Sequence, residues 1–257
     1  MTLKLSLIGA SGRAGKEVLR VLPEFSQFSL VSAITSGKGS STAQSVGCAI
    51  PFSSDLKSGV AAADCVLEFT SAAASVEVAK LCALHQRPLV LASSGHTEDQ
   101  LAQIRVAAQQ TAIFHSANLS LGVFVLHEIS KHAQRLLGPS YQVEIFEMHH
   151  RHKKDAPSGT ALSLARHLAA GSNLETIRDR GSRVGSRKDS ELGVSALRGG
   201  EVLGEHTVFF LGQADRLELT HRTADRAVFA RGGLMALEKL IGKPAGLYTF
   251  AQLFDIC

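Results

Sequence analysis

Three glycines at a regular spacing stand within the first fifteen residues of the chain, in the stretch LIGASGRAGKEV. Gly9, Gly12 and Gly15 follow an apolar segment typical of a strand and precede a segment with the spacing of a helix. At such a turn, glycine allows a tight bend and lets backbone N–H groups approach a pyrophosphate at the helix N-terminus. The pattern therefore favours a dinucleotide-binding turn, and the alternative is a tight turn that binds nothing.

The same alternation of strand and helix continues through the first 120 residues. The expected strands cover 3–9, 28–35, 64–70, 88–95 and 111–118, and the expected helices cover 14–22 and 72–86, with a third that begins after Thr97. Glu98 and Asp99 suit the first turn of that third helix, where the helix dipole favours negative charge. Strands this apolar, separated by helices, indicate a parallel sheet covered on both faces.

The pattern changes after a longer helix over 120–137. Expected elements there are a strand over 141–150, a helix over 158–170, strands over 194–198, 204–212 and 215–223, and a helix over 225–241. The last three strands have short connections, so we expect antiparallel neighbours. The final helix could pack on either unit, and we assign it to the first. The prediction is an α/β protein with a Rossmann-like dinucleotide-binding domain, 1–119 plus 226–257, and an inserted α+β domain, 120–225.

Composition limits the class of partner. The net charge is +4, tryptophan is absent and only two tyrosines occur, which argues against a base-stacking nucleic-acid platform. No apolar run approaches a membrane span, and the N-terminus has no pattern of a signal peptide. The four cysteines lack C-x-x-C spacing, and Cys65 and Cys82 stand in apolar patterns of the core. We expect a cytoplasmic protein with reduced thiols that binds neither nucleic acid nor membrane.

The end of the second strand bears on the choice of cofactor. An acidic residue there usually holds the ribose 2′-hydroxyl of NAD, but this chain has Thr35, Ser36 and Lys38. Hydroxyl and ammonium groups can accept a 2′-phosphate that a carboxylate would repel. We therefore expect NADPH, or tolerance of both NADPH and NADH; the alternative is a loop that contacts no cofactor.

The stretch EIFEMHHRHKKDAPSGTAL combines a basic cluster with the start of a helix. Pro157 disfavours helix at the residue before it, so the helix begins just after the proline. Ser158, Gly159 and Thr160 would then offer free backbone N–H groups and two hydroxyls at a positive helix end, which suits an anion. An apolar stripe anchors the helix, formed by Ala161, Leu164, Ala165 and Leu168.

A carboxylate substrate fits this corner, and a neighbouring histidine could transfer a proton near neutral pH. With a hydride from a nicotinamide, the two parts amount to a reduction. Two other interpretations exist for the histidine run His149, His150 and His152. A metal site is disfavoured because no cysteine stands near these histidines and because adjacent residues of a strand face opposite sides of the sheet. A nucleic-acid patch is at odds with the short length of the run.

The segment EMHHRHKKDAPSGTAL closely resembles the long signature of the dihydrodipicolinate (4-hydroxy-tetrahydrodipicolinate) reductase family. Further similar segments extend over nearly the whole chain: IGASGRAG, LEFTS, LASSG, SANLSLGV, GEHTVFF and FARG. The resemblance implies a Rossmann-like domain plus a substrate and oligomerisation domain with an open mixed sheet. It also implies homotetramers built through that second sheet.

The family's residue roles transfer to matching positions. The resemblance implies that His149 is the general acid, that Lys153 assists it, and that His150, Ser158, Gly159 and Thr160 hold the carboxylates. It places the cofactor phosphates on the first glycine turn and the nicotinamide near two later turns. The implied cofactor-binding residues are Gly9, Ala10, Ser11, Gly12, Arg13, Ala14, Ala92, Ser93, Ser94, Ser116, Ala117, Asn118 and Leu119, to which the charge argument adds Thr35 and Ser36.

Three departures from the family pattern concern the cofactor. The acid after the second strand is missing, Ala92-Ser93-Ser94 replaces the usual Gly-Thr-Thr, and Leu119 stands where an aromatic residue or methionine is common. The function implied is NADPH- or NADH-dependent reduction of 4-hydroxy-tetrahydrodipicolinate, a small dicarboxylate, in lysine and diaminopimelate synthesis. Two alternatives are another Rossmann oxidoreductase for an amino-acid-derived dicarboxylate and a nucleotide sensor without catalysis; a sensor needs no His149 or Lys153.

Overall fold

The computed structural model describes residues 2–36, 50–178, 180 and 185–254, so Lys38, Cys48 and Cys257 lie outside the described residues. The chain divides into two compact units, Met1–Ser120 with Arg226–Cys257, and Leu121–Asp225. The boundaries expected from the sequence, 1–119 plus 226–257 and 120–225, differ from this division by one residue. Each unit has its own sheet.

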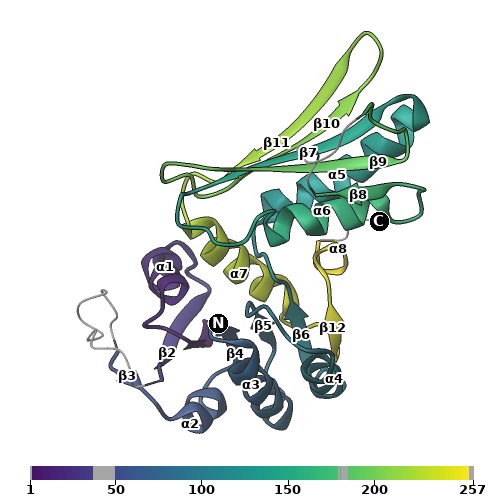
Figure 1. Cartoon of the computed structure of the whole chain (residues 1–257). Coiled ribbons are helices and arrows are strands. Elements are labelled where there is room, and N and C mark those ends of the chain that lie inside the picture. Colours follow the sequence, from purple (N-terminus) through teal and green to yellow (C-terminus); the bar gives the residue numbers. More distant parts are fainter. Residues whose placement is uncertain (1, 37–49, 179, 181–184, 255–257) are drawn as a thin grey trace. The chain divides into compact units, whose positions relative to one another are not determined.

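The first unit contains a parallel sheet of seven strands in the order β12-β6-β5-β4-β1-β2-β3 (Figure 1). Its strands are β1 Leu3–Ile8, β2 Phe28–Ile34, β3 Phe52–Ser53, β4 Cys65–Glu68, β5 Leu89–Leu91, β6 Ala112–His115 and β12 Gly246–Tyr248. Its helices are α1 Arg13–Val21, α2 Leu56–Ala61, α3 Ala72–His85, α4 Glu98–Ala107, α7 Ala227–Leu240 and α8 Phe250–Leu253, with a 3₁₀ turn at Leu22–Glu24. The Rossmann-like α/β fold is confirmed.

Helices pack on both faces of this sheet because the strand residues are apolar on both sides. Val66 of β4 belongs to a core shared with α3 and α4, whereas the next residue, Leu67, approaches Gly233 of α7. Helix α4 begins as expected: Thr97 accepts a hydrogen bond from Gln100 N–H, and the Gln100 side chain accepts one from Thr97 N–H, which forms a capping box. The final helix α7 packs within this unit against α1, β4, β5 and β6.

The second unit contains a mixed sheet of five strands in the order β11-β10-β7-β9-β8. Its elements are α5 Leu121–Leu137, β7 Gln142–His149, α6 Gly159–Ala169, β8 Glu175–Ile177, β9 Glu191–Arg198, β10 Glu205–Leu211 and β11 Arg216–Arg222, with a 3₁₀ turn at Gly138–Ser140. Helices α5 and α6 cover one face. The core between them and the sheet includes Val143, Ile145, Leu164, Val194, Val208 and Phe210.

The expected pairing of strands was wrong in one place. Strands β10 and β11 are antiparallel neighbours as expected, but β9 does not pair with β10; β7 lies between them, parallel to β9 and antiparallel to β10. The link 199–204 therefore crosses the carboxyl end of β7, where Gly199 N–H donates to His149 O and Arg151 N–H donates to Gly200 O. A short connection could thus pass over one strand because that strand ends at the crossing.

The core contains the two cysteines that the sequence assigned to it. Cys65 and Cys82 are buried free thiols, and burial raises the pKa of Cys65 to about 12. No helix among the described residues combines the length and the hydrophobicity that crossing a membrane requires.

Candidate active site

Three strands of the second unit change from apolar to polar on their helix-covered face at the same end of the sheet. On β7, Glu147 and His149 continue the buried row of Val143 and Ile145. The register pairs Glu147 with His206 of β10, and His149 with Arg198 of β9. The sheet thus brings together two histidines, a carboxylate and a guanidinium, of which only His149 was identified from the sequence.

The buried Glu147 and the half-buried Arg198 form a two-point ion pair. The Arg198 Nη1 and Nη2 atoms donate to the two Glu147 oxygens at 2.9 and 2.8 Å. Arg198 also donates to the carbonyl oxygens of Asp155 and Leu197, and Ser158 N–H donates to Glu147 Oε1 at 2.9 Å. Bonds of this charged kind contribute about 1.5–3 kcal/mol each, which compensates a carboxylate with no exposed surface.

The same carboxylate holds the His149 ring. Glu147 Oε2 lies 2.5 Å from His149 Nδ1, and the histidine is 8% exposed. Burial alone would raise the pKa of Glu147, but the hydrogen bonds from His149, Arg198 and the Ser158 amide outweigh burial and lower it to about 2. Glu147 is therefore a carboxylate at neutral pH, and it favours a proton on Nδ1 of His149.

His206 lies beside His149, with the two rings edge to face and their centroids 5.2 Å apart. The pKa of His206 is lowered to about 3, mainly by burial and to a smaller extent by the neighbouring His149. His206 Nε2 lies 3.2 Å from the Ser158 hydroxyl. The two adjacent imidazoles thus have different environments, one beside a carboxylate and one kept neutral.

The turn after Pro157 leads into α6 as predicted, but Ser158 has a different part from the one expected. Its hydroxyl accepts from Ala161 N–H as the helix N-cap, its amide donates to Glu147, and it is 2% exposed. The expectation of a free Ser158 amide was wrong, because the buried carboxylate needs that donor. Gly159 is exposed, with no described atom within 4 Å of its Cβ direction. The open space at this corner therefore lies at Gly159, at the start of α6.

The basic loop lies between β7 and this helix. Lys153 pairs with Asp155 at 3.0 Å, its N–H donates to His150 O, and this pairing lowers the pKa of Asp155. The His150 ring is half-buried, 6.1 Å from the exposed ring of His152. Among the described residues, no three His, Cys, Asp or Glu side chains are grouped so that they could hold a metal ion.

The first unit presents its expected cofactor residues along the carboxyl edge of the parallel sheet. Gly9, at φ +89°, has the Phe69 carbonyl oxygen 2.2 Å from where a Cβ would stand, and the Cβ of Gly15 would meet Gly9 O at 2.2 Å. Only glycine fits both positions. Gly12 is the N-cap of α1 and supplies no side-chain cap, and the Ser11 and Thr35 hydroxyls lie 2.6 Å apart. This tight turn at an uncapped helix end fits a dinucleotide phosphate.

The remaining residues of the glycine turn and the adjoining loop differ in exposure: Ala10 is buried, Ala14 is half-buried, and Arg13 and Ser36 are exposed.

The turn after β6 is held by its own side chains, since Ser116 Oγ donates to Asn118 O and Asn118 Oδ1 accepts from Ser120 N–H. Ala117 in this turn is exposed.

A second buried carboxylate organises the turns after β4 and β5. Glu68 accepts from Ser93 Oγ at 2.7 Å, from Ser93 N–H at 3.3 Å, and from both the amide and the hydroxyl of Thr70. Ser93 is therefore 6% exposed, between a half-buried Ala92 and an exposed Ser94. Leu119 is 2% exposed and lies against Gly232 and Gly233 of α7, so its side chain belongs to the core of this unit.

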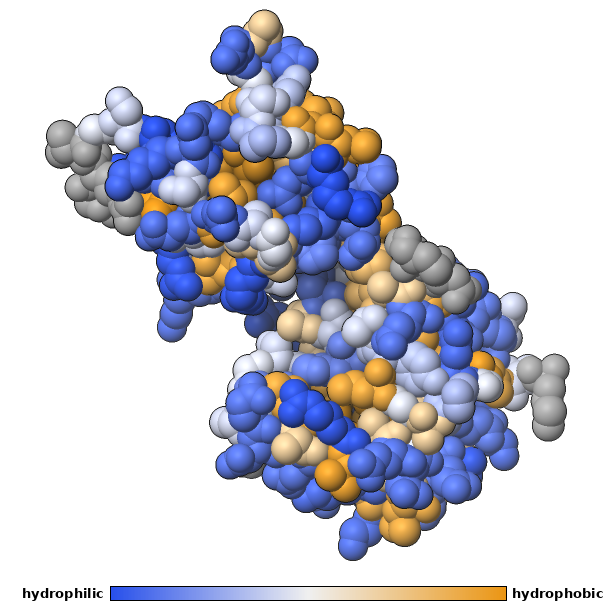
Figure 2. Space-filling model, turned by 90° about the vertical axis from the view of Figure 1, so that its right-hand side faces the viewer, coloured by the Kyte–Doolittle hydropathy of each residue, from blue (hydrophilic) through white to orange (hydrophobic). Residues whose placement is uncertain are grey.

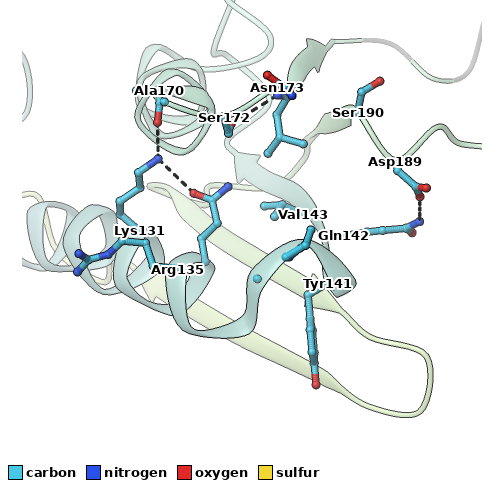
Figure 3. A pocket seen from close by; sticks show the side chains of 15 residues that line it. Lys131, Arg135, Tyr141, Gln142, Val143, Ala170, Ser172, Asn173, Asp189 and Ser190 are labelled. Atoms are coloured by element: carbon cyan, nitrogen blue, oxygen red, sulfur yellow. Dashed lines mark hydrogen bonds between the residues drawn. The ribbon is translucent and has the colours of Figure 1, made fainter.

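A cavity of about 630 Å³ in the second unit lies at the opposite end of β7 and α6 (Figure 3). Gln142 and Val143 line it from β7, and Ala170 lines it from the end of α6. Its polar side chains already bond within the chain: Lys131 Nζ donates to Ala170 O at 2.6 Å, and Gln142 Nε2 donates to Asp189 Oδ1 at 3.1 Å. The histidine and helix-start residues singled out from the sequence are not part of this cavity.

The sequence comparisons cover both units. The family profile described as "Dihydrodipicolinate reductase, N-terminus" matches residues 3–119, and "Dihydrodipicolinate reductase, C-terminus" matches residues 122–254. The chain belongs to the dihydrodipicolinate reductase family. A relative from Anaeromyxobacter sp. (strain Fw109-5), named 4-hydroxy-tetrahydrodipicolinate reductase, is 40% identical over 258 residues and covers 96% of each chain. One of the same name from Beijerinckia indica is 37% identical over 265 residues, covering 99% of this chain and 98% of its own.

The solved structures agree on the fold of this family. The dipicolinate-bound dihydrodipicolinate reductase from Paenisporosarcina sp. TG-14 superposes with a TM-score of 0.81 at 20% identity and covers all of both chains. A myo-inositol dehydrogenase from Corynebacterium glutamicum superposes with a TM-score of 0.63 at 12% identity, over 99% of this chain and 92% of its own. The resemblance stated from the signature is therefore confirmed.

Proposed function

We propose that this chain reduces 4-hydroxy-tetrahydrodipicolinate to tetrahydrodipicolinate in lysine and diaminopimelate synthesis, with NADPH or NADH as the reductant. One hydride and one proton enter and one water leaves. The observation that carries the proposal is the strand end at His149: a buried imidazole held by a carboxylate, followed within the same unit by a basic loop and an open helix start. A dicarboxylate needs the anion site, and its reduction needs the proton donor.

The two carboxylates of the substrate would bind around the start of α6. Gly159 and Thr160 supply the helix end, His150 and Lys153 supply positive charge or hydrogen-bond donors, and Ser158 shapes the corner from beneath. A helix end contributes about 0.3–1 kcal/mol and a charged hydrogen bond more, so side-chain contacts would dominate affinity. The dipicolinate bound to the structural relative has the same pair of carboxylates.

His149 would donate the proton, assisted by Lys153. A general acid of this kind typically contributes about 10²–10⁴-fold to rate. After the transfer, the neutral ring would keep its remaining proton on Nδ1, the nitrogen that lies 2.5 Å from Glu147 Oε2. The histidine thus returns to its starting state by taking one proton from solvent.

The first unit would hold the nicotinamide cofactor, which supplies the hydride when bound. The phosphates would rest on the turn from Gly9 to Ala14, and Ala92–Ser94 with Ser116–Leu119 would shape the nicotinamide end, with Leu119 contributing through its backbone. Thr35 and Ser36 offer hydroxyls and no carboxylate at the end of β2, which favours NADPH or tolerance of both cofactors.

We also propose a cytoplasmic homotetramer assembled through the open face of the mixed sheet. On β7 and β10 the side chains alternate between the helix-covered core and that face. Phe146, Met148 and Phe209 point away from the core and are half-buried, and the neighbouring Leu197 is 48% exposed. Figure 2 shows hydrophobic residues at the surface among hydrophilic ones.

The test is a coupled assay that generates the substrate from pyruvate and aspartate semialdehyde with the preceding enzyme and follows nicotinamide absorbance. We expect oxidation of at least one cofactor, and none with either would refute the function. His149→Gln should lower kcat by about 10²-fold or more while cofactor affinity stays nearly constant. The exposed histidine His152, changed to Gln, is the matched control. Equal loss of turnover and cofactor binding in His149→Gln would show a structural histidine instead.

A further inference from the structure

Glu147 is charged and fully buried, so it cannot contact a substrate bound at the start of α6. It accepts hydrogen bonds from three donors: the His149 ring, the Arg198 guanidinium and the Ser158 amide. Each of its oxygens has two donors, so the carboxylate cannot rotate without losing contacts. Its place between the proton donor and the N-cap of α6 suggests a role in holding them together.

We propose that Glu147, clamped by Arg198, is a positioning residue that fixes the proton of His149 on Nδ1 and leaves Nε2 as the atom that donates to the substrate. This inference rests on the proposed function and extends it to two residues to which nothing else assigns a role. The proton leaves Nε2 and the electron pair of that N–H bond stays on the ring. The carboxylate stabilises the imidazolium before transfer and holds the neutral ring afterwards.

The surroundings of Nε2 support this assignment. Gly204, in the link that crosses the end of β7, would place a Cβ 2.9 Å from His149 Nε2. Glycine at this position keeps the space before Nε2 clear, whereas any side chain would fill it. Nδ1, in contrast, is covered by Glu147. Only one nitrogen of the ring can therefore meet a substrate.

The charged and titratable groups around His149 come from every strand packed against it. Glu147 is on its own strand, Arg198 on β9 and neutral His206 on β10; the Lys153–Asp155 pair follows in the next loop. His206, whose pKa burial lowers to about 3, carries no charge at neutral pH, so the ionised group in direct contact with the His149 ring is the Glu147 carboxylate.

The decisive variant is Glu147→Gln. The glutamine side chain has one NH₂ group, and at either oxygen position this group would face two other donors. At the position of Oε2 these donors are His149 Nδ1 and Arg198 Nη1, and at the position of Oε1 they are Arg198 Nη2 and the Ser158 amide. We expect kcat to fall by about 10²-fold, while the dissociation constant of pyridine-2,6-dicarboxylate changes less than about tenfold.

The matched control is Glu144→Gln on the same strand, which removes a carboxylate with its own arginine partner, Arg187, at 2.7 Å. This control should keep the wild-type kcat. Glu147→Asp, which keeps the charge but withdraws it from Nδ1, provides a second variant if Glu147→Gln does not fold. It should lower kcat by a smaller factor than Glu147→Gln does.

A readout independent of turnover is ¹⁵N NMR of the His149 ring. The wild type should show the neutral ring protonated on Nδ1, and Glu147→Gln should show a mixture or the other tautomer. A wild-type ring protonated on Nε2, or an unchanged kcat in both Glu147 variants, would overturn the inference. Absence of turnover in the wild type would refute the proposed function alone, since the NMR result remains interpretable.

Discussion

At the scale of the residue, the end of β7 shows how neighbours decide the charge of a side chain. Glu147 and His206 are both buried and directly paired across β7 and β10. Three donors keep Glu147 ionised, whereas burial without a full charge partner keeps His206 neutral. His149, between them, has an ionised partner on one side and an uncharged one on the other, which fits the role of proton donor that we propose for it.

The neutral state of His206 predicts a pH-dependent stability. Its pKa lies near 6.5 in the unfolded chain and at about 3 in the folded one, so between these values the unfolded chain binds more protons. The free energy of unfolding therefore decreases as pH falls, by about 2 kcal/mol between pH 7 and pH 5 for this residue. His206→Gln should lack this contribution and lose less stability over that interval, as measured by denaturant unfolding at the two pH values.

The control for this experiment is the exposed His152→Gln, which should follow the wild type. Glu147 does not contribute to the change in stability between pH 7 and pH 5. Its pKa is lowered from 4.5 to about 2, so the stability that it provides is lost only as pH falls from about 4.5 towards 2. A lower stability of His206→Gln at pH 7 would not affect the comparison, since the loss between the two pH values is what counts. An equal loss in wild type and His206→Gln would contradict a neutral buried His206.

At the scale of the element, the sequence predicted most strands and helices because their apolar periodicity is strong. It missed α2, β3, β8, β12 and α8, which have two to six residues each and are too short for periodicity to show. The alternation along β7 predicts one burial that was not used in the sequence analysis. Val143, Ile145, Glu147 and His149 stand at every second position, so they share one face of the strand, and the Glu147 carboxylate is buried with the apolar residues.

The partners of that carboxylate could not be predicted from the sequence. Arg198 and His206 stand at matching inward positions of their strands, but they meet Glu147 only because β7 lies between β9 and β10. That order depends on a connection passing over the end of β7, which short links do not usually do. The sequence also did not show that the Ser158 amide has an acceptor, because that acceptor is the side chain of Glu147 in the preceding strand.

The end of β2, which lies beside the glycine turn, carries a prediction about cofactor choice. Thr35 follows β2 and its hydroxyl lies 2.6 Å from that of Ser11 in the glycine turn. Thr35→Glu would add a negative charge where a 2′-phosphate is expected. We expect NADPH binding to weaken about tenfold more than NADH binding, in fluorescence titrations of each cofactor.

Thr35→Gln is the matched control for size, and it should weaken both cofactors by similar factors. If Thr35→Glu weakens NADPH no more than NADH, the end of β2 does not contact the adenosine ribose, and the sequence argument about this loop is wrong.

At the scale of the whole molecule, each unit has a complete core of its own, and the chemistry divides along the same boundary. The first unit has the features of a nucleotide site, and at the turns that the structure describes in it no buried acid–histidine pair like that of Glu147 and His149 occurs; Glu68 bonds hydroxyls and amides instead. The second unit has the buried histidine and the open helix start to which we assign proton transfer and anion binding. This division explains why the strongest sequence signals, the glycine turn and the histidine signature, stand more than a hundred residues apart.

The mixed sheet supports the last prediction, which concerns assembly. On β7 and β10 the side chains of its helix-covered face are buried within the unit, whereas Phe146, Met148 and Phe209 on the other face are only half-buried, beside the exposed Leu197. In a tetramer joined through this face, a charge at its centre would be desolvated without a partner. We expect Phe209→Lys to convert the tetramer into smaller species in sedimentation velocity experiments, while its secondary structure stays unchanged. Leu84→Lys, at an apolar position of α3 that is 72% exposed, should leave the assembly intact. A wild-type protein that sediments as a monomer at micromolar concentration would contradict the tetramer, and a tetramer unaffected by Phe209→Lys would place its interfaces elsewhere.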